Sequence, residues 1–173
     1  MTTESGKPNY HEAFKAVLLF RALAAPAQDF LFERAEILRF EGGEKIVSNG
    51  DLSPSFFAVL KGNVHVSMRQ EGKDVYIDTL GESMVFGEAA MFLKTPRTAD
   101  VTSAESCVLV KLTRFDLMDF LREYPRDGNK VLLALVYGLL LKLRSSNQEL
   151  VFERRGDNGQ NDVDALVAEL TRA

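Results

Sequence analysis

Short apolar runs separated by turn-forming residues occupy the middle of the chain, from Glu36 to Leu112. The runs are rich in β-branched and aromatic residues, and turn clusters such as Glu41-Gly42-Gly43 separate them. Short strands at this regular spacing predict a β-sandwich or barrel. The predicted strands are Glu36–Phe40, Glu44–Ser48, Ser55–Lys61, Asn63–Gln70, Lys73–Leu80, Arg97–Ala104 and Ser106–Lys111.

The segment before these strands has a helical pattern. Apolar residues recur at helical spacing over Tyr10–Ala25, which predicts one helix with a buried face. Pro26 is expected to interrupt this helix, and Asp29–Glu33 to add a short second helical turn. The polar stretch 1–9 is expected to be disordered.

Two further helices are predicted after the strands. Thr113 is suited to be an N-cap, so a helix over Arg114–Glu123 is expected, and Tyr124-Pro125 should end it. Asp127-Gly128-Asn129 then leads into the longest helix, about Lys130–Val151. The fold class is therefore mainly β with flanking helices (α+β), with an N-terminal helix and C-terminal helices.

The longest predicted helix is apolar on almost all sides over Val131–Leu141. A helix that packs on one sheet needs only one apolar stripe, so the extra face requires a second partner. Burial against the N-terminal helix and the last segment would also satisfy it. The chain then continues through a polar linker, Arg154–Asn161, to a short helix that Asp162 could cap.

Composition places the chain among soluble globular proteins of one domain. It has 173 residues, 46% of them hydrophobic and 27% charged. A formal charge of −4 and a pI near 5.3 argue against a nucleic-acid surface. The single cysteine, Cys107, cannot form an internal disulfide, which indicates a reducing cytoplasm.

Membrane and metal partners are not expected. The start of the chain lacks the basic-then-apolar order of a signal peptide, and Val131–Leu141 is too short to span a bilayer. The two histidines, His11 and His65, are far apart in the sequence and have no clustered ligands, so no metal site or other cofactor is predicted.

One stretch, residues 86–99, concentrates the candidate chemistry between two strand-like runs. Gly87 lets a ligand approach the main chain. If residues 88–92 start a short helix, the backbone N–H groups at its N-terminus would face an anion. Arg97 adds a planar fork of donors suited to a phosphate, and Glu88 can accept a bond from a sugar hydroxyl. Together these features predict a nucleotide site.

The same stretch resembles the phosphate-binding cassette of the cyclic nucleotide-binding domain. The family pattern F-G-E, a small residue, Ala and an apolar pair, followed by P-R-[A/S/T]-A, is matched by Phe86-Gly87-Glu88-Ala89-Ala90-Met91 and Pro96-Arg97-Thr98-Ala99. The resemblance covers about Phe20 to Asn147 and implies a jelly-roll-type β-roll, as in CRP-like proteins and protein kinase A regulatory subunits. Outside the cassette it rests on Phe40–Ile46, Gly50-Asp51 and Phe56–Val64.

The resemblance implies roles for the matching residues. Glu88 would bind the ribose 2′-hydroxyl, and Arg97 would pair with the exocyclic phosphate oxygens. Thr98 would donate to phosphate or base. The other implied ligand-binding residues are Gly87, Ala89 and Ala90 through their backbone N–H groups, Ala99 within the motif, Phe86, Val66 and Ile77 lining the pocket, and Leu143 and Asn147 capping the base.

Two segments depart from the family pattern, and one residue bears on the base. Gly81-Glu82-Ser83-Met84 stands where the family often has Gly-Pro-Gly-Asp, and Arg126–Asn129 adds residues relative to many relatives. The hydroxyl of Thr98 could reach the amino group of a syn guanine, but small hydroxyl residues also occur in cyclic AMP receptors. We expect cyclic AMP (cAMP), with cyclic GMP (cGMP) as the alternative.

The function implied is that of a cyclic nucleotide sensor. If the ligand binds better when the last helix closes over the base, it stabilises that state. Too little chain follows Leu150 for a helix-turn-helix, so a stand-alone domain without a DNA-binding domain, acting on an unidentified effector protein, is expected. In the family the long helix commonly forms a dimer seam, and the spacing of Leu132, Leu135, Leu139 and Leu143 suits a homodimer.

Two other functions were weighed against the sensor. One is a ligand-free protein-interaction module that retains the fold. The other is an enzyme such as a phosphodiesterase, which would need a metal cluster or a general base near the phosphate; the sequence offers neither. The predicted organisation is a disordered start (1–9), the binding domain (10–152), and a linker with a short helix (153–173).

Overall fold

The computed structural model divides the chain into two compact units, Met1–Ala134 and Leu135–Ala173, and each is treated by itself. The boundary predicted after residue 152 lies outside the described residues. The structure describes residues 2–3, 7–70, 72–93 and 95–144.

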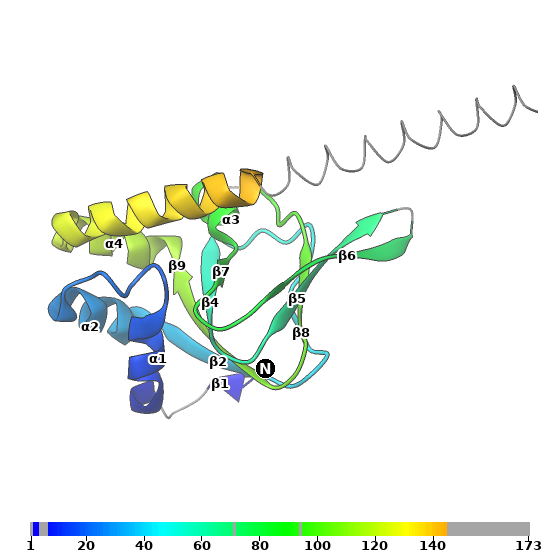
Figure 1. Ribbon diagram of the computed structural model, residues 1–173, viewed down its shortest axis with the longest axis horizontal. Helices are drawn as coiled ribbons and strands as arrows, with labels where there is room; N and C mark the ends of the chain where they lie inside the picture. Colours follow the sequence, from blue (N-terminus) through cyan, green and yellow to red (C-terminus); the bar gives the residue numbers. More distant parts are fainter. Residues whose placement is uncertain (1, 4–6, 71, 94, 145–173) are drawn as a thin grey trace, which may run out of the picture. The chain divides into compact units, whose positions relative to one another are not determined.

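The described strands of the first unit form two antiparallel sheets (Figure 1). One sheet has the strand order β1-β2-β9-β4-β7 and the other the order β3-β8-β5-β6. Together with the flanking helices, these sheets confirm the predicted mainly β fold of the β-roll type. The strands are β1 (Thr2–Thr3), β2 (Glu36–Phe40), β3 (Lys45–Val47), β4 (Ser55–Lys61), β5 (Val64–Gln70), β6 (Lys73–Leu80), β7 (Val85–Phe86), β8 (Asp100–Ser103) and β9 (Cys107–Thr113).

Most strand bounds agree with the sequence prediction. The ends of β2, β4 and β6 are as predicted, β3 and β8 are shorter at both ends, and β9 continues to Thr113. Strand β7 was not predicted, because two residues are too few to show an alternating pattern. Strand β1, which pairs with β2, and the 3-10 helix η1 (Lys7–Tyr10) fall within the stretch expected to be disordered.

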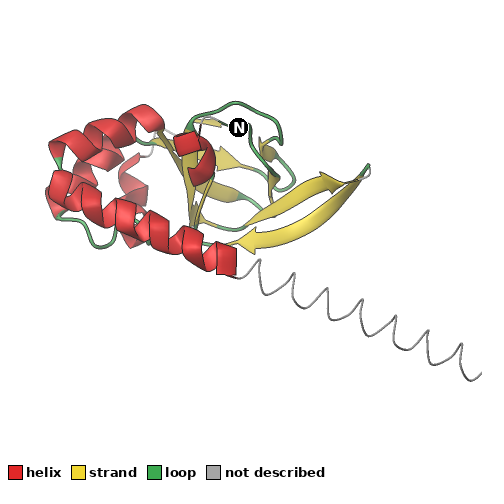
Figure 2. Cartoon of the chain, turned by 90° about the horizontal axis from the view of Figure 1, so that it is seen from above, coloured by secondary structure: helices red, strands yellow, loops and turns green. Residues whose placement is uncertain are grey.

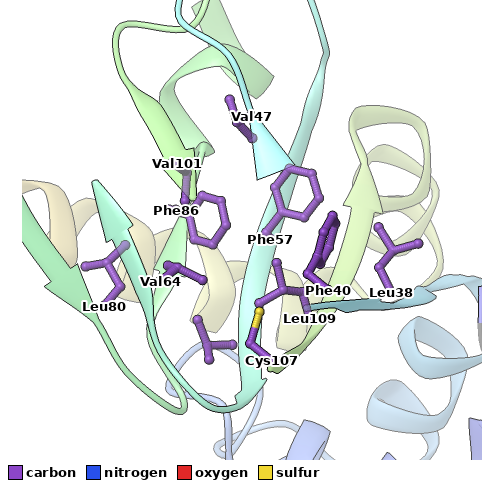
Figure 3. Packing of buried hydrophobic residues seen from close by; sticks show 11 residues of the cluster. Leu38, Phe40, Val47, Phe57, Val64, Leu80, Phe86, Val101, Cys107 and Leu109 are labelled. Carbon is purple, nitrogen blue, oxygen red and sulfur yellow. The ribbon is translucent and has the colours of Figure 1, made fainter. Parts of the chain in front are cut away.

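The two sheets enclose one part of the core, which we call the inter-sheet core. Every strand except β1 contributes at least one buried side chain to it (Figure 3). Burial of one such apolar side chain contributes about 1.5–3 kcal/mol, so the core dominates the stability of the roll. Its members are Leu38, Phe40, Val47, Phe57, Val59, Val64, Leu80, Phe86, Val101, Cys107 and Leu109.

Helices cover the other face of the five-stranded sheet. Figure 1 shows α1 (His11–Ala16), α2 (Ala25–Arg34) and α4 (Arg114–Glu123) gathered on the side away from β5 and β6. The rings of Phe14 and Phe20 stack with centroids 4.5 Å apart, and Phe20 lies 6.4 Å from Phe56 on β4. Because β4 faces the inter-sheet core on one side and these rings on the other, six of its seven residues are buried.

The N-terminal helix differs from the prediction in two ways. The helix predicted over Tyr10–Ala25 ends at Ala16, where Val17 turns to an extended conformation with ψ 133°. Buried side chains at positions 17, 20 and 23 then follow a series of tight turns rather than a helix. Pro26 lies in the first turn of α2 instead of interrupting a helix, because the missing N–H of proline costs nothing there.

The segments after β9 are helical, as predicted. Thr113 caps α4 by accepting a bond from the Asp116 backbone N–H at 3.2 Å, and Asp116 reciprocates. The next helix covers residues 125–144, so Asp127-Gly128-Asn129 is its first turn and not a loop. Pro125 suits a first helical position, and a Cβ at Gly128 would collide with Leu121 of α4. No helix among the described residues is long and apolar enough to cross a membrane.

Figures 1 and 2 both show the β5–β6 hairpin extending beyond the rest of the two sheets. A register shift between Val66 and Ser67 marks a bulge in this hairpin. Val64 is buried before the bulge, whereas Met68 is 40% exposed after it. The outer part of the hairpin therefore lies beyond the inter-sheet core.

Candidate nucleotide-binding site

The predicted cassette begins at the end of β7. Gly87 has φ +83°, a conformation that glycine adopts readily, and it turns the chain from β7 into the short helix α3 (Glu88–Leu93). Helix α3 contacts β4 and lies beside β7 in Figure 1. The helix predicted over residues 88–92 is confirmed.

Arg97 enters the same region from the loop between α3 and β8. Its side chain is buried, with Nη1 donating to the Gly87 carbonyl at 2.9 Å and Nη2 donating to the Ser55 carbonyl at 2.5 Å. The guanidinium carbon lies 5.9 Å from the centre of the Phe57 ring. Within the described part of the chain, the buried Nε has no hydrogen-bond partner.

The main chain around Arg97 is also fixed. Its N–H donates to the Asp51 carbonyl at 2.9 Å, and its carbonyl accepts from the Gly50 N–H at 2.8 Å. Burial lowers the pKa of Arg97, while the carboxylates of Asp51 and Glu88 oppose that effect. The site therefore holds a buried cation that interacts electrostatically with two acidic groups, and its loop is bonded to the turn before β4.

The remaining cassette residues divide into buried and exposed members. Glu88 and Ala90 are each 6% exposed, whereas Ala89 and Thr98 are exposed and Ala99 is half-buried. Glu88 and Arg97 interact electrostatically, so the fold brings together the carboxylate and the arginine predicted for ribose and phosphate. Their ligand roles stay predictions.

Three of the five other predicted ligand residues lie on strands of the first unit. Phe86 belongs to the inter-sheet core and stacks on Phe57 at 5.1 Å, and Val66 packs against the same core. Ile77 is 49% exposed on β6. Leu143 is exposed within the second unit, and Asn147 lies outside the described residues.

Sequence reasoning did not predict the groups that hold Arg97. Two of them are main-chain carbonyls, at Ser55 and Gly87, and any residue type has a carbonyl. Phe57 had a usable signal, because its place in an apolar strand predicts burial next to the sheet that carries the cassette. Gly50-Asp51 was predicted as part of a turn and as part of the family resemblance, but not as a partner of Arg97.

Metal ligands were considered separately. His11 pairs with Asp29 at 2.8 Å, and His65 contacts the Thr79 hydroxyl at 2.8 Å. Across the described ranges, no group of three or more His, Cys, Asp or Glu side chains could hold a metal ion.

The fold is an antiparallel β-roll, and its helical cassette buries one carboxylate and one arginine. These features define a jelly-roll-type domain with a candidate anion site. The sequence profile described as "Cyclic nucleotide-binding domain" matches residues 37–124, about half of the chain. The chain belongs to the cyclic nucleotide-binding domain family. Domains of this family are regulatory rather than catalytic.

Relatives and solved structures agree with that assignment. A cyclic nucleotide-gated channel of Caenorhabditis elegans is 29% identical over 174 residues, covering 94% of this chain and 23% of the channel. The type II regulatory subunit of cAMP-dependent protein kinase from Drosophila melanogaster is 30% identical over 65% of this chain and 29% of the subunit. The crystal structure of a cyclic nucleotide-binding domain from Methylobacillus flagellatus has the same fold, with a TM-score of 0.78, 21% identity and 87% of each chain covered. The chain thus spans between a fifth and a third of these curated relatives.

Proposed function

We propose that this chain is a cyclic nucleotide sensor that binds cAMP more tightly than cGMP and regulates a separate protein. One observation carries the proposal: the buried guanidinium of Arg97 has an Nε without a hydrogen-bond partner among the described residues, and it interacts electrostatically with the buried carboxylate of Glu88. A cyclic nucleotide carries one phosphodiester charge next to a ribose 2′-hydroxyl. The phosphodiester matches the donor, Arg97, and the 2′-hydroxyl matches the acceptor, Glu88.

Electrostatics supports an anionic ligand at this place. A buried cation is costly unless charges or hydrogen bonds compensate it, and two carbonyl dipoles compensate Arg97 only in part. A phosphate oxygen would add a charge-assisted bond, which is roughly twice as strong as a neutral one. Phosphate binding at Arg97 is therefore expected to strengthen the binding of a cyclic nucleotide.

The identity of the nucleotide base and the output of the sensor are further parts of the proposal. Thr98 is exposed, so its hydroxyl is accessible to a base or a phosphate. We propose cAMP as the main ligand, in line with the name of the Drosophila relative, cAMP-dependent protein kinase regulatory subunit. The proposed output is a change in conformation of the C-terminal helix that alters binding to an effector protein.

The proposed module is not itself an enzyme, and its proposed setting is the reducing cytoplasm. The regulatory character of the family supports the first point. A single buried cysteine, Cys107, supports the second, because it cannot form an internal disulfide.

A homodimer is a further part of the proposal. The helix over residues 125–144 exposes large apolar side chains, and such a face is usually covered by a partner. Of the leucines predicted for the seam, Leu135 is 4% exposed, whereas Leu139 and Leu143 are 40% and 58% exposed. The more exposed residues are Leu133, Val136, Tyr137, Leu140, Leu141 and Leu143.

Titration calorimetry with cAMP and cGMP tests the sensor directly. Replacement of Arg97 by alanine should weaken cAMP binding about 10–100-fold, since hydrogen bonds to charged groups contribute about 1.5–3 kcal/mol. Arg21, which is exposed, provides the matched control, and Arg21→Ala should bind as the wild type does. Circular dichroism would verify that each variant is folded.

A ligand-free interaction module is the second candidate, and one observation favours it. Both terminal nitrogens of Arg97 have main-chain partners, so neither needs a nucleotide in order to be hydrogen-bonded. Absence of heat and of a thermal shift with either nucleotide would support this candidate and exclude the sensor. Binding that persists unchanged in Arg97→Ala would contradict the site proposed above.

A further inference from the structure

Arg97 is positioned to connect separate segments of the chain as well as to bind a phosphate. Its two terminal nitrogens bond carbonyls from different places in the chain, Ser55 at the start of β4 and Gly87 at the start of the cassette. With Arg97 on the loop after α3, these bonds connect three segments at one point. The residue is 5% exposed, so an anion in solvent has little access to it in this conformation.

The space around the guanidinium is fitted closely to this arrangement. A Cβ atom on Gly87 would lie too close to Nη1 of Arg97, so only glycine allows the contact. The ring of Phe57 packs in the inter-sheet core and so limits movement toward that core. Movement away from Ser55 and Gly87 is therefore the route by which Arg97 could meet a ligand.

The same conformation leaves one polar atom unsatisfied. Nε of Arg97 is buried and has no partner within the described part of the chain, and a buried unpaired donor is costly. This conformation thus shields Arg97 from solvent, yet it retains a donor that a phosphate could satisfy. A contact that a ligand can displace needs both the shielding of Arg97 and the unsatisfied donor.

We propose that Arg97 forms a latch, consisting of its bonds to the Gly87 and Ser55 carbonyls, which a cyclic nucleotide must open in order to bind. The inference rests on the proposed function, because it describes how that site is regulated. Opening the latch releases the cassette loop from β4, so ligand binding and loosening of the β4 contact occur together. The affinity is then set by competition between a phosphate and two carbonyls.

Lysine and alanine at position 97 separate the latch from ligand binding. An ammonium cannot span both carbonyls as the guanidinium fork does, but it still offers a positive charge to a phosphate. Arg97→Ala and Arg97→Lys should therefore both lower the melting temperature of the nucleotide-free protein, by about 5 °C or more. Arg97→Lys should bind cAMP more tightly than Arg97→Ala. The exposed control, Arg21→Ala, should leave both quantities unchanged.

Side-chain NMR of protein labelled with ¹⁵N-arginine observes the latch itself. Without nucleotide, the Nη protons of Arg97 should give resolved, slowly exchanging signals, whereas those of Arg21 should be averaged; the Arg97→Lys spectrum assigns the signals. Saturating cAMP should shift the Arg97 signals. Averaged Arg97 signals in the nucleotide-free protein, or unchanged melting temperatures in both variants, would overturn the latch even if cAMP binds.

Failure of the sensor has a different signature. Resolved Arg97 signals that do not change with cAMP, together with no heat of binding, would refute the proposed function. Arg97 would then be a permanent connection between β4 and the cassette, and the gating role would be overturned. Resolved signals that shift, with heat of binding, support both proposals.

Discussion

The inter-sheet core contains Phe57, and Arg97 of the cassette lies near the same ring. The two regions nevertheless differ in the charge of their buried ionisable groups. In the core, Cys107 stays neutral, because burial first and Glu105 and Glu44 second raise the pKa of its thiol to about 11. In the cassette, Arg97 is almost as buried, yet a guanidinium remains charged. The core is thus complete without a ligand, whereas the cassette keeps a charge that a ligand could compensate.

The largest expected effect comes from removal of Phe86, which joins the two regions. Its ring stacks on Phe57 within the core, and the residue after it is Gly87 of the cassette. Phe86→Ala should lower the free energy of unfolding by about 3–5 kcal/mol, the usual range for a buried phenylalanine. Urea denaturation measures the loss, and Phe86→Leu, which keeps most of the volume, should lose much less. Equal losses in the two variants would show that Phe86 is not a core residue.

Replacement of Gly87 by alanine should break the cassette specifically. A residue with a Cβ at positive φ costs about 1 kcal/mol, and displacement of Arg97 from a charge-assisted bond costs about 1.5–3 kcal/mol more. We therefore expect a total loss of about 3 kcal/mol in the free energy of unfolding.

The chain contains a matched control for this change. Gly43 has the same φ of +83°, but a Cβ there would meet nothing within 4 Å. Gly43→Ala should lose only the backbone contribution, about 1 kcal/mol. If both variants lose the same amount, the close approach of Arg97 to Gly87 does not matter for stability.

The neutral thiol in the core predicts a pH dependence. The thiol has its ordinary pKa in the unfolded chain and a raised pKa in the folded one, so the unfolded state alone ionises between about pH 9 and 11. The free energy of unfolding should therefore be unaffected below pH 9 and fall above it, by up to about 1.4 kcal/mol per pH unit. The measurement compares Cys107→Ala with the wild type over this range. An identical decline in both proteins would contradict the assignment to Cys107.

The strands could be predicted from the sequence because their runs are long enough to show apolar patterning and are bounded by turn residues. Errors occurred where tertiary packing decided the outcome. Val17 and Phe20 have helical spacing, but their burial against other aromatic rings occurs in tight turns. Gly128 was expected in the segment before the long helix, yet it lies in that helix, where a Cβ would require the Leu121 side chain to shift.

The cassette shows a similar limit. The residue types at 87, 88 and 97 predicted an anion site, and the fold brings them together. The direction of Arg97 could not be predicted, because its acceptors are main-chain carbonyls without a sequence signature. Pairing of β7 with β4 places the ring of Phe86 in the inter-sheet core, and its predicted role in lining the pocket stays a prediction.

The smallest expected effect is on stability, at Ser83 before β7, the end of the strand opposite to Gly87. Ser83, in the turn before this strand, has φ +68°, the one non-glycine residue at positive φ among the described residues. The N–H of Ser83 donates to the Val59 carbonyl at 2.8 Å, and the Ser83 carbonyl accepts from the Leu18 N–H. Both are backbone bonds, so they would persist in a glycine variant.

Ser83→Gly should therefore relieve about 1 kcal/mol of backbone strain, less what glycine loses through its more flexible unfolded chain. The net gain should be about 0.5 kcal/mol, measured as a higher urea midpoint at an unchanged slope. Ser83→Ala keeps the Cβ and should show no gain; a gain with alanine would place the strain in the serine hydroxyl instead. Glycine at position 83 would thus stabilise the turn before β7. Loss of glycine at position 87, after β7, would instead disrupt the cassette, because Arg97 is packed where a side chain at position 87 would be.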